Sequence, residues 1–420
     1  MSSLTFRTVA ELENLGEASL QTGPFGTQLK ASEYVDEGIP VINVRNIGFG
    51  DVRKEDLEYV NEAKAEKLHQ HRLRKGDIVF GRKGAVERHA LIDENVDGWI
   101  QGSDCLRLRI KSRDVCERYL SHYLKTQAHQ DWMQALCSFG ATMTSLNQDI
   151  VRRISFPAPP IEEQKKIAAT LTTYDELIEN NQRRIALLEK MAEEIYREWF
   201  IRLRFPGHEQ VKVIKGVPEG WRPSCLGSVA KFTMGQSPSS EFYNEVGNGL
   251  PFHQGVGTYG ERFPRTVTYC SEDGRRAHKG DILFSVRAPV GRLNIADREM
   301  IIGRGLSAIR HKKEHNHYLY YLLKTAFVNE DIIGNGSIFN SVGKDELAKF
   351  PVFEPEPGLV EKFDAMVSNI DKQITMLMQA TECLKSSRDA LLPRLISGKL
   401  SVENLDIQFP PGMAETANAA

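Results

Sequence analysis

Apolar residues recur at alternating steps of four and three along two long stretches of the chain, one in its middle and one near its end. This spacing is typical of the a/d seam of a coiled coil. It predicts one helix over residues 159–205 and a second over residues 356–398. The predicted first seam is Ile167, Leu171, Tyr174, Ile178, Asn181, Ile185, Leu188, Ala192, Ile195 and Trp199, and the second is Phe363, Val367, Ile370, Ile374, Leu377, Thr381, Leu384, Arg388, Leu391 and Leu395.

The two seams are copies of one another, because every member of the second lies 196 residues after its counterpart (363 − 167 = 196). The segments before the helices repeat as well. KGDIVFGRKGAV (residues 75–86) returns as KGDILFSVRAPVG (residues 279–291), and YLSHYLKT (residues 119–126) returns as YLYYLLKT (residues 318–325). The chain is therefore a globular segment plus a helix, written twice. This pseudo-two-fold pattern favours a reader of a two-part target over a single active site; the alternative is an old duplication without functional use.

The globular segments mix strand and helix signals. Short β-rich or alternating runs at residues 39–47 and 106–110 predict strands, and residues 51–71 and 119–136 have helical character. The predicted fold class is α+β: two mixed α/β globular domains joined by two long antiparallel coiled-coil helices. The expected division is residues 1–158 and 206–355 for the domains, 159–205 and 356–398 for the helices, and 399–420 for a C-terminal tail.

Prolines and polar seam residues refine the two helices. Proline is tolerated in the first helical turn, so Pro160 and Pro357 mark helix starts, whereas Pro393 is expected to kink or stop the second helix. Asn181 and Thr381 are polar seam residues, as is Arg388. Such residues can fix helix register, although local fraying or a water-filled pocket explains each one equally well.

Composition excludes several classes of protein. The 420 residues suffice for two or three domains, and no apolar run approaches the roughly 18 residues of a membrane span. The N-terminus lacks the blocks of a signal peptide, which predicts a cytoplasmic protein. The six cysteines form no C-x-x-C pair, so no metal site is predicted. The net charge of −2 argues against a polybasic coat for DNA, but a localised basic surface remains compatible with it.

Motifs for catalysis are missing from the sequence. It contains no phosphate-binding P-loop, no nucleophile elbow and no H-E-x-x-H helix. Gly255, Gly257 and Gly260 form a G-x-G-x-x-G, but the motif follows Pro251-Phe252-His253 and precedes the β-like run RFPRTVTY, whereas a dinucleotide site needs an apolar strand before it and a helix start after it. A flexible or DNA-facing loop is therefore the better interpretation. We therefore predict a non-catalytic chain with no catalytic residues and no cofactor of its own.

What remains is a set of polar and basic loops that occur in both halves. Arginine can bind guanine through two hydrogen bonds, asparagine and glutamine can do the same for adenine, and hydroxyl groups suit phosphates or either base. Each residue alone is more often an ordinary surface residue, and only the recurrence of the loops makes the group a candidate. The predicted DNA-binding residues are Lys30, Arg45, Asn46, Arg82, Lys83, Arg88, Thr142, Thr144 and Asn147 in the first half, and Gln236, Ser237, His253, Gln254, Arg287, Arg292, Arg304, Ser337 and Asn340 in the second.

With these features in place, the sequence resembles the specificity subunit of type I restriction-modification enzymes. The resemblance rests on GPFGTQLK, PVINVRNI, KGDIVFGRKGAV, FPAPPIEEQKKIAA, LLPRLISGKLSV and the second copy KGDILFSVRAPVG, and it spans nearly the whole chain. It implies two target-recognition domains, each of which reads half of a bipartite double-stranded DNA target. It also implies that the helices act as a spacer and as docking sites for two methyltransferase subunits.

The resemblance assigns the chemistry to partners. S-adenosylmethionine would serve adenine N6-methylation in the methyltransferase subunits, and ATP and Mg would serve restriction motor-nuclease subunits, of which two are possible partners. The segment that leads into the second helix, FPVFEPEPGLVEKF, lacks the PPIEEQ motif that begins the first helix. Equal docking on both helices is therefore not implied.

Three other readings stay open at this point. One is a similar recognition subunit that serves a related phage-defence methyltransferase, which neighbouring genes would identify. Another is a free-standing sequence-specific regulator, which would bind its operator tightly alone, although the sequence has no helix-turn-helix signature. The third is a coiled-coil scaffold without nucleic-acid function, which would leave the recurring basic loops unexplained.

Overall fold

A computed structural model of the chain describes residues 5–138, 145–327, 332–333, 337–338, 341–410 and 413. The chain forms two compact units. Unit 1 comprises Met1–Asn181 and Ala380–Ala420, and unit 2 comprises Gln182–Gln379. Each unit therefore contains one globular part together with part of each long helix. Within the described residues, no helix is both long enough and apolar enough to cross a membrane.

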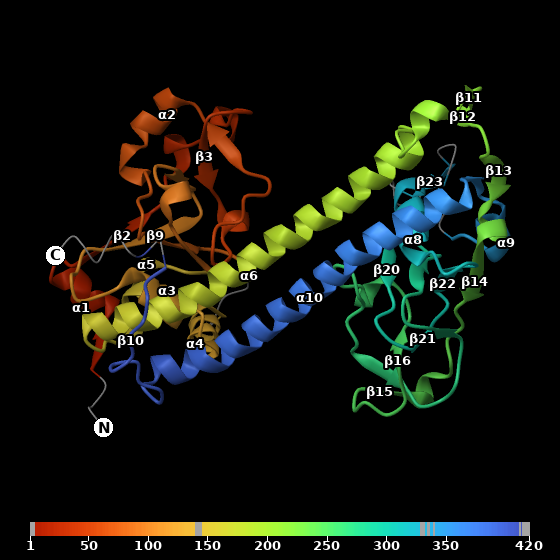
Figure 1. Cartoon of the computed structure of the whole chain (residues 1–420). Coiled ribbons are helices and arrows are strands. Elements are labelled where there is room, and N and C mark those ends of the chain that lie inside the picture. Colours follow the sequence, from red (N-terminus) through yellow and green to blue (C-terminus); the bar gives the residue numbers. More distant parts are fainter. Residues whose placement is uncertain are drawn as a thin grey trace. The chain divides into compact units, whose positions relative to one another are not determined.

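The two long helices are α6 (Ile161–Tyr196), which continues as a π-helical turn over Arg197–Ile201, and α10 (Pro357–Ile396). In unit 1 the beginning of α6 and the end of α10 contribute to one apolar core, and in unit 2 the end of α6 shares a core with the beginning of α10. The helix segments in each unit are thus paired in antiparallel fashion (Figure 1).

The prolines define the helix starts as expected, but Pro393 does not end α10. Pro160 immediately precedes α6, and its carbonyl accepts a hydrogen bond from the backbone N–H of Gln164. Pro393 lies inside α10, which continues to Ile396 before Gly398 adopts a positive φ of 70°. Proline lacks the N–H that would bond to the carbonyl four residues earlier, but the Pro393 carbonyl accepts from the Ser397 backbone N–H at 3.1 Å, which closes the last turn.

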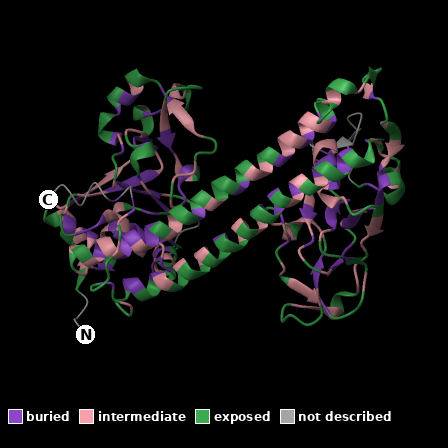
Figure 2. Cartoon of the chain, viewed as in Figure 1, coloured by how far each residue is buried: buried purple, intermediate pink, exposed green. Residues whose placement is uncertain are grey.

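All the predicted seam residues are buried or half-buried, and the elements that pack against them differ along the helices. Ile167 and Leu171 lie in a core with α1 (Val9–Asn14) and α3 (Glu117–Leu124), whereas Phe363 and Val367 lie in a core with α8 (Asn316–Ala326). Figure 2 shows buried residues concentrated near the helix ends and mainly exposed residues along the middle of each helix. The heptad pattern therefore reflects packing against the globular parts as well as between helices.

The globular part of unit 1 is built on two sheets. A five-stranded sheet has the order β2-β9-β6-β7-β4, a three-stranded sheet has the order β5-β3-β8, and strands β1 and β10 form a separate antiparallel pair. The strands are β1 (Phe6–Thr8), β2 (Ala18–Thr22), β3 (Ile39–Ile42), β4 (Phe49–Gly50), β5 (Glu58–Val60), β6 (Ile78–Gly81), β7 (His89–Leu91), β8 (Ile100–Gln101), β9 (Cys105–Ile110) and β10 (Ser155–Pro157). The remaining α-helices are α2 (Glu62–Lys67), α4 (Gln127–Ser138) and α5 (Gln148–Arg152).

Unit 2 has the same plan with local additions. A four-stranded sheet has the order β14-β22-β19-β20, a five-stranded sheet has the order β15-β17-β16-β21-β18, and β13 pairs with β25. The strands are β13 (Arg222–Cys225), β14 (Ala230–Met234), β15 (Tyr243–Asn244), β16 (Leu250–His253), β17 (Thr268–Cys270), β18 (Arg276–Ala277), β19 (Ile282–Ser285), β20 (Leu293–Ile295), β21 (Met300–Ile302), β22 (Leu306–His311) and β25 (Pro351–Glu354). Two further antiparallel strand pairs are β11 (Val213–Ile214) with β12 (Val217–Pro218) and β23 (Ile332–Ile333) with β24 (Ser337–Ile338). The unit also contains the short helices α7 (Leu226–Val229) and α9 (Lys344–Lys349).

Strand pairing establishes which positions of the two units correspond. Strand β3 runs parallel to β8 with Ile42 opposite Gln101, and β16 runs parallel to β21 with His253 opposite Ile302. The next residues, Asn43 and Gln254, are thus equivalent. The sequence repeat is therefore a repeat of fold.

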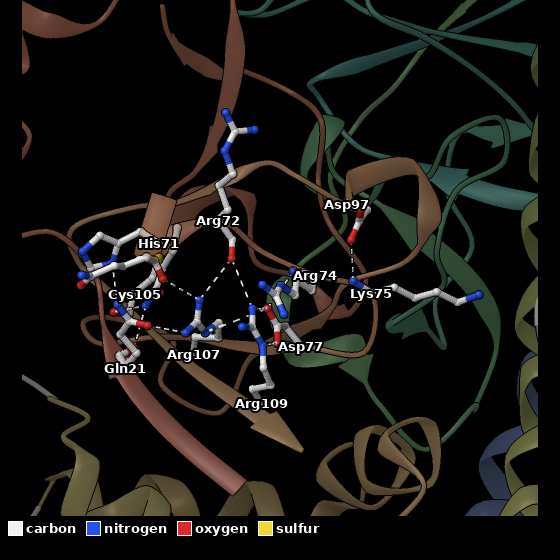
Figure 3. A network of polar contacts seen from close by, with 12 residues as sticks. Gln21, His71, Arg72, Arg74, Lys75, Asp77, Asp97, Cys105, Arg107 and Arg109 are labelled. Atoms are coloured by element: carbon white, nitrogen blue, oxygen red, sulfur yellow. Dashed lines mark hydrogen bonds and ion pairs between the residues drawn. The ribbon is translucent and has the colours of Figure 1, made fainter. Parts of the chain in front are cut away.

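The KGD motif is explained by a buried ion pair at the start of each central strand. In unit 1 the Asp77 carboxylate is fully buried and accepts from Arg109 Nε at 2.6 Å and Nη2 at 2.7 Å, and also from the Arg74 backbone N–H at 2.8 Å (Figure 3). In unit 2, Arg310 Nε donates to Asp281 at 2.5 Å. The pair links β6 to β9 in unit 1 and β19 to β22 in unit 2.

A second buried arginine extends the network of Figure 3. Arg107 donates from Nη1 to the carbonyls of Gln70 and Arg72 at 3.1 and 3.2 Å, and from Nη2 to the side chain of Gln21. Burial lowers the pKa of Arg107 to about 10, a value at which the side chain is still charged at neutral pH. Two cations therefore lie near the single carboxylate of Asp77.

Two expected helices differ from the sequence prediction. Residues 51–71 contain strand β5 and only the six-residue helix α2, since the charged run has too little apolar periodicity to bury a helical face. The helix expected over residues 119–136 is broken into α3 and α4. The break falls at Lys125–Thr126, where the Thr126 hydroxyl donates to the Tyr123 carbonyl.

The packing of α3 against α6 predicts acid sensitivity. His122 on α3 is buried, its Nε2 lies 3.3 Å from Thr172 Oγ1 on α6, and burial lowers its pKa to about 3. Below pH 6.5 the unfolded chain takes up a proton that the folded His122 does not, so stability falls by about 1.4 kcal/mol per pH unit until the folded pKa is reached. Urea denaturation at pH 7.5 and 5.0 should show the wild type losing about 2 kcal/mol more than His122→Gln.

The matched control is His278→Gln, because the side chain of His278 is 63% exposed. This control should keep the wild-type dependence on pH. If His122→Gln also kept it, buried neutral His122 would not be a source of the acid sensitivity.

Candidate nucleic-acid interface

Three loops of unit 1 cross in close contact beyond the ends of strands β2, β3 and β8. Gly23 follows β2, Asn43 follows β3 and Gly102 follows β8. A Cβ atom on Gly23 would lie 1.9 Å from the Gly102 carbonyl oxygen, and one on Gly102 would lie 2.2 Å from Asn43 Oδ1. Only glycine fits at both positions, because the approaching atoms include backbone. We call this contact the unit 1 loop crossing.

Unit 2 has the equivalent unit 2 loop crossing, made by Gly235, Gln254 and Gly303. A Cβ on Gly235 would lie 2.1 Å from the Gly303 carbonyl oxygen, and one on Gly303 would lie 2.5 Å from Gln254 Oε1. The same three strand ends thus bring their loops together in both halves. Loops held by a rigid sheet in this way are suited to binding.

Two arginines of unit 1 lie over exposed phenylalanine rings, and one of these rings, Phe25, belongs to the loop that begins with Gly23 of the unit 1 loop crossing. The Arg82 Cζ is 5.2 Å from the ring centre of Phe25, which is 53% exposed, and the Arg88 Cζ is 5.3 Å from that of Phe49, which is 40% exposed. An arginine held over an aromatic face loses less conformational freedom on binding and retains its charge. The pairs therefore present ordered cations next to apolar surface.

One cation occupies the same place in both units. Lys83 follows β6 and forms an isolated β-bridge with Ser145, while Arg287 follows β19 and forms one with Ser341. The residues before these cations also correspond, since Arg82 accepts a backbone hydrogen bond from Leu146 and Val286 accepts one from Val342, each at 2.9 Å. Lys83 also pairs with Asp104 at 3.2 Å. The conserved geometry places a positive side chain at the equivalent loop of each half.

The unit 2 crossing carries an ordered polar cluster. The Arg304 backbone N–H donates to Ser237 Oγ at 3.2 Å, and Ser237 Oγ donates to Gln254 Oε1 at 2.8 Å. The hydrogen bond from Ser237 turns the amide oxygen of Gln254 toward the protein, although the Gln254 side chain is exposed. The structure thus brings together Ser237, Gln254 and Arg304, three of the predicted DNA-binding residues, with the exposed Gln236 adjacent in the chain.

Burial contradicts the prediction of DNA binding for two residues, Asn46 and His253. Asn46 is fully buried, and its Nδ2 donates to the carbonyls of Arg53 and Glu55 at 3.1 and 2.9 Å. His253 is also fully buried, with Nδ1 2.8 Å from Thr258 Oγ1, and burial lowers its pKa to about 4. Both side chains are buried beneath a loop and bond to neighbouring protein atoms, so neither reaches the surface.

Other predicted residues that the structure describes lie on the surface with varied partners. Arg45 pairs with Glu58 at 2.9 Å, and the Asn147 side chain accepts from the Ile150 N–H as the N-cap of α5. Lys30 and Arg292 are exposed. Thr142, Thr144 and Asn340 lie outside the described residues, and the side chain of Ser337 is not described.

Sequence reasoning missed three kinds of residue in these sites. The exposed Phe25 and Phe49 carried no polar signal, although Phe25 stands inside the Gly-Pro-Phe-Gly loop. The crossing glycines Gly23 and Gly235 follow equivalent strands, which the strand assignment alone could have suggested. Asn43 is not among the predicted residues, unlike the nearby Arg45, yet it lies at the unit 1 loop crossing and donates to Glu58 at 2.6 Å.

Comparison with known proteins decides the family. The family model for the type I restriction modification DNA specificity domain matches residues 11–190 and again residues 218–374. The chain belongs to this family. Each match covers most of one globular part and a portion of the helix that follows it, which is the repeat seen in the fold.

Relatives of this family cover almost the whole chain. A putative type I restriction enzyme MjaX specificity subunit from Methanocaldococcus jannaschii is 29% identical over 89% of this chain and 90% of its own length. The MjaIX specificity subunit from the same organism is 26% identical over 94% of each chain. A solved type I restriction-modification S subunit from M. genitalium shares the fold, with a TM-score of 0.61 and 17% identity over 94% of this chain and 96% of that one.

As a member of the specificity family, the chain is a DNA-recognition subunit and is not the catalytic subunit. DNA and other restriction-modification subunits are its partners. Two family domains in one chain fit a target in two parts. In the described part of the chain, no group of three or more His, Cys, Asp or Glu side chains is arranged to hold a metal ion.

Proposed function

We propose that each unit of this specificity subunit reads one half of a bipartite DNA sequence through its loop crossing. The observation that carries the proposal is the equivalence of the two crossings, each with three strand ends in contact and a cation, Lys83 or Arg287, at the same loop. Side chains on loops that recur at equivalent places, but that differ in identity, can read different bases with the same scaffold.

The chemistry of the loops suits a division between phosphates and bases. Arg82 and Arg88 can donate in pairs to guanine or to phosphate, and Gln254 directs amide hydrogens outward, which suits an acceptor on a base edge. The net charge of −2 and the pairing of Lys83 with Asp104 keep the positive field modest. We therefore expect weak binding by the isolated chain and tight binding only in the assembled complex.

The long helices are proposed to set the distance between the half-sites and to dock the partners. Helix α6 has 36 residues, which at 1.5 Å per residue make about 54 Å. The functional division is residues 1–158 and 206–355 for recognition, 159–205 and 356–398 for spacing and docking, and 399–420 as a tail. The partners are two methyltransferase subunits that use S-adenosylmethionine and, where present, two restriction subunits that use ATP and Mg, all in the cytoplasm.

Mapping N6-methyladenine across the host genome, with the gene present and deleted, tests the proposal. The expected result is that deletion removes methylation from one bipartite motif with a fixed number of unread base pairs. A motif with a variable number of unread pairs would contradict the spacing role of the helices. Methylation that does not depend on the gene would contradict the recognition role and favour a free-standing DNA-binding protein.

A further inference from the structure

Two carboxylates occupy equivalent positions on the long helices. Asp175 on α6 and Asp371 on α10 are separated by 196 residues (371 − 175 = 196), the offset that relates the two seams. Each one contacts two positively charged or protonatable side chains that come from two other elements of its own unit. We call Asp175 and Asp371 the bridging carboxylates.

In unit 1, Asp175 joins three elements. Its Oδ2 accepts from Lys125 Nζ at 2.9 Å at the end of α3, and its Oδ1 accepts from Arg388 Nη1 at 2.7 Å on α10. Burial raises the pKa of Asp175, but the charges of Lys125 and its neighbours outweigh that effect and leave the pKa below its ordinary value. The carboxylate is therefore ionised at neutral pH and connects the globular part with both helices.

In unit 2, Asp371 makes the corresponding connection. Its Oδ1 lies 2.6 Å from Arg262 Nη2, and its Oδ2 lies 2.6 Å from His317 Nδ1 on α8. Arg262 also approaches Glu189 on α6 at 3.4 Å and lies over the Tyr320 ring at 5.3 Å. The Arg262 side chain is only 2% exposed, so the loop that carries it is held against both helices.

One cation at each bridging carboxylate is linked by a chain of contacts to a candidate DNA-contacting loop. In unit 1, the side chain of Lys125 lies against Gly50, where an added Cβ would come within 2.2 Å of Lys125 Cε. Gly50 follows Phe49, the ring beneath Arg88. A continuous line of contacts thus runs from Arg88 to Asp175.

In unit 2 the connection runs through one loop. The backbone N–H of Arg265 donates to the Thr258 carbonyl at 2.7 Å, which closes the loop that carries Arg262. Thr258 Oγ1 lies 2.8 Å from His253 Nδ1, and His253 directly precedes Gln254. The buried His253 thus lies between the helix contact and the crossing.

We infer that Asp175 and Asp371 are positioning residues that fix the orientation of each unit's DNA-contacting loops relative to its helix segments, and so make the spacing between half-sites strict. This inference rests on the proposed function, in which the helices separate two reading units. Non-directional apolar packing alone lets a globular part shift by small amounts, whereas short charged contacts from one carboxylate to two other elements restrict that shift. Loss of either carboxylate should relax the spacing and leave base recognition unchanged.

The test is genome-wide N6-methyladenine mapping in hosts that carry Asp175→Asn or Asp371→Asn in the full chain. The wild type should methylate its motif at one spacing only. Each variant should raise methylation at spacings one base pair longer or shorter by at least tenfold, with the same bases required in both half-sites. Lys125→Gln and His317→Gln, which remove one contact each, should give a smaller increase in methylation at the same neighbouring spacings. They keep the test decisive if the Asp175→Asn or Asp371→Asn chain fails to fold.

The controls are carboxylates on the same helices whose ion pairs stay within one helix. Glu162 pairs with Lys165 on α6, and Glu382 pairs with Lys385 on α10. Glu162→Gln and Glu382→Gln should keep the strict spacing. If the bridging variants lost methylation at the native spacing without any gain at neighbouring spacings, the carboxylates would be merely structural and the inference would be overturned. If the wild type itself showed no bipartite motif, the proposed function would fail instead.

Discussion

Replacing Asp77 by alanine is expected to lower the free energy of unfolding of unit 1 by about 3–5 kcal/mol. The carboxylate is fully buried and is bound by both Nε and Nη2 of Arg109, with Arg107 Nε 4.0 Å away. Its removal leaves two largely buried guanidinium groups without their counter-charge, and it also leaves the Arg74 backbone N–H without its acceptor. Breaking a buried pair from one side is far more damaging than replacing both partners.

Hydrogen exchange measured by mass spectrometry can assign the loss to one unit. Strands β6 and β9 should lose protection in Asp77→Ala, and strands β19 and β22 should not; Asp281→Ala should give the reverse pattern. The control is Glu94→Gln, because Glu94 pairs with Lys75 at the surface, where its side chain is 60% exposed. This control should change stability by less than about 1 kcal/mol. Equal effects of Asp77→Ala and Glu94→Gln would contradict the importance of the buried network.

Much of the architecture could be predicted because its signals are periodic or repeated. The heptad spacing located both long helices, and the common offset of 196 residues established that the halves are copies. The same reasoning could not say what covers the seam. Ile167 and Phe363 pack against globular helices as well as against the paired helix, and a heptad pattern is the same in either environment.

The candidate sites were predicted less well, because polarity in a sequence does not reveal direction. Asn46 and His253 are polar residues beside loops, yet both point inward and bond to neighbouring backbone or side chains. Arg82 and Arg287 lie in the repeated KGD segment, where the turn after a buried strand directs the chain to the surface. The crossing glycines and the rings of Phe25 and Phe49 depend on contacts between distant segments, which no local pattern contains.

The bridging carboxylates show the limit most clearly. Asp175 and Asp371 stand among many charged residues on helices whose exposed faces are expected to be charged. The 196-residue offset that relates them applies equally to every pair of positions along the helices, so nothing in the sequence distinguishes them. Their partners Lys125, Arg388, Arg262 and His317 come from four different elements, so the connection exists only in the folded chain.

Removing both arginines that lie over phenylalanine rings should strongly weaken recognition of one half-site and leave the other intact. Each arginine contact to a base or phosphate contributes about 1–3 kcal/mol, and 1.4 kcal/mol is a factor of ten in affinity. The double variant Arg82→Ala/Arg88→Ala is therefore expected to reduce methylation of the bipartite target about 30-fold or more. The measurement is methylation by the assembled complex on DNA in which one half-site at a time is randomised.

The sharpest control is the opposite half of the same chain. Arg287→Ala/Arg304→Ala removes two exposed cations of unit 2, and it should relax base selectivity only at the half-site that Arg82→Ala/Arg88→Ala leaves unchanged. Arg202→Ala, in the exposed turn after α6, should alter neither half-site, because Arg202 pairs with Glu194 and Glu198. If both double variants weakened all sequences equally, with a smaller dependence on salt, the arginines would contact phosphates only. Loss of complex assembly would instead assign them to folding, and base reading by these loops would be wrong.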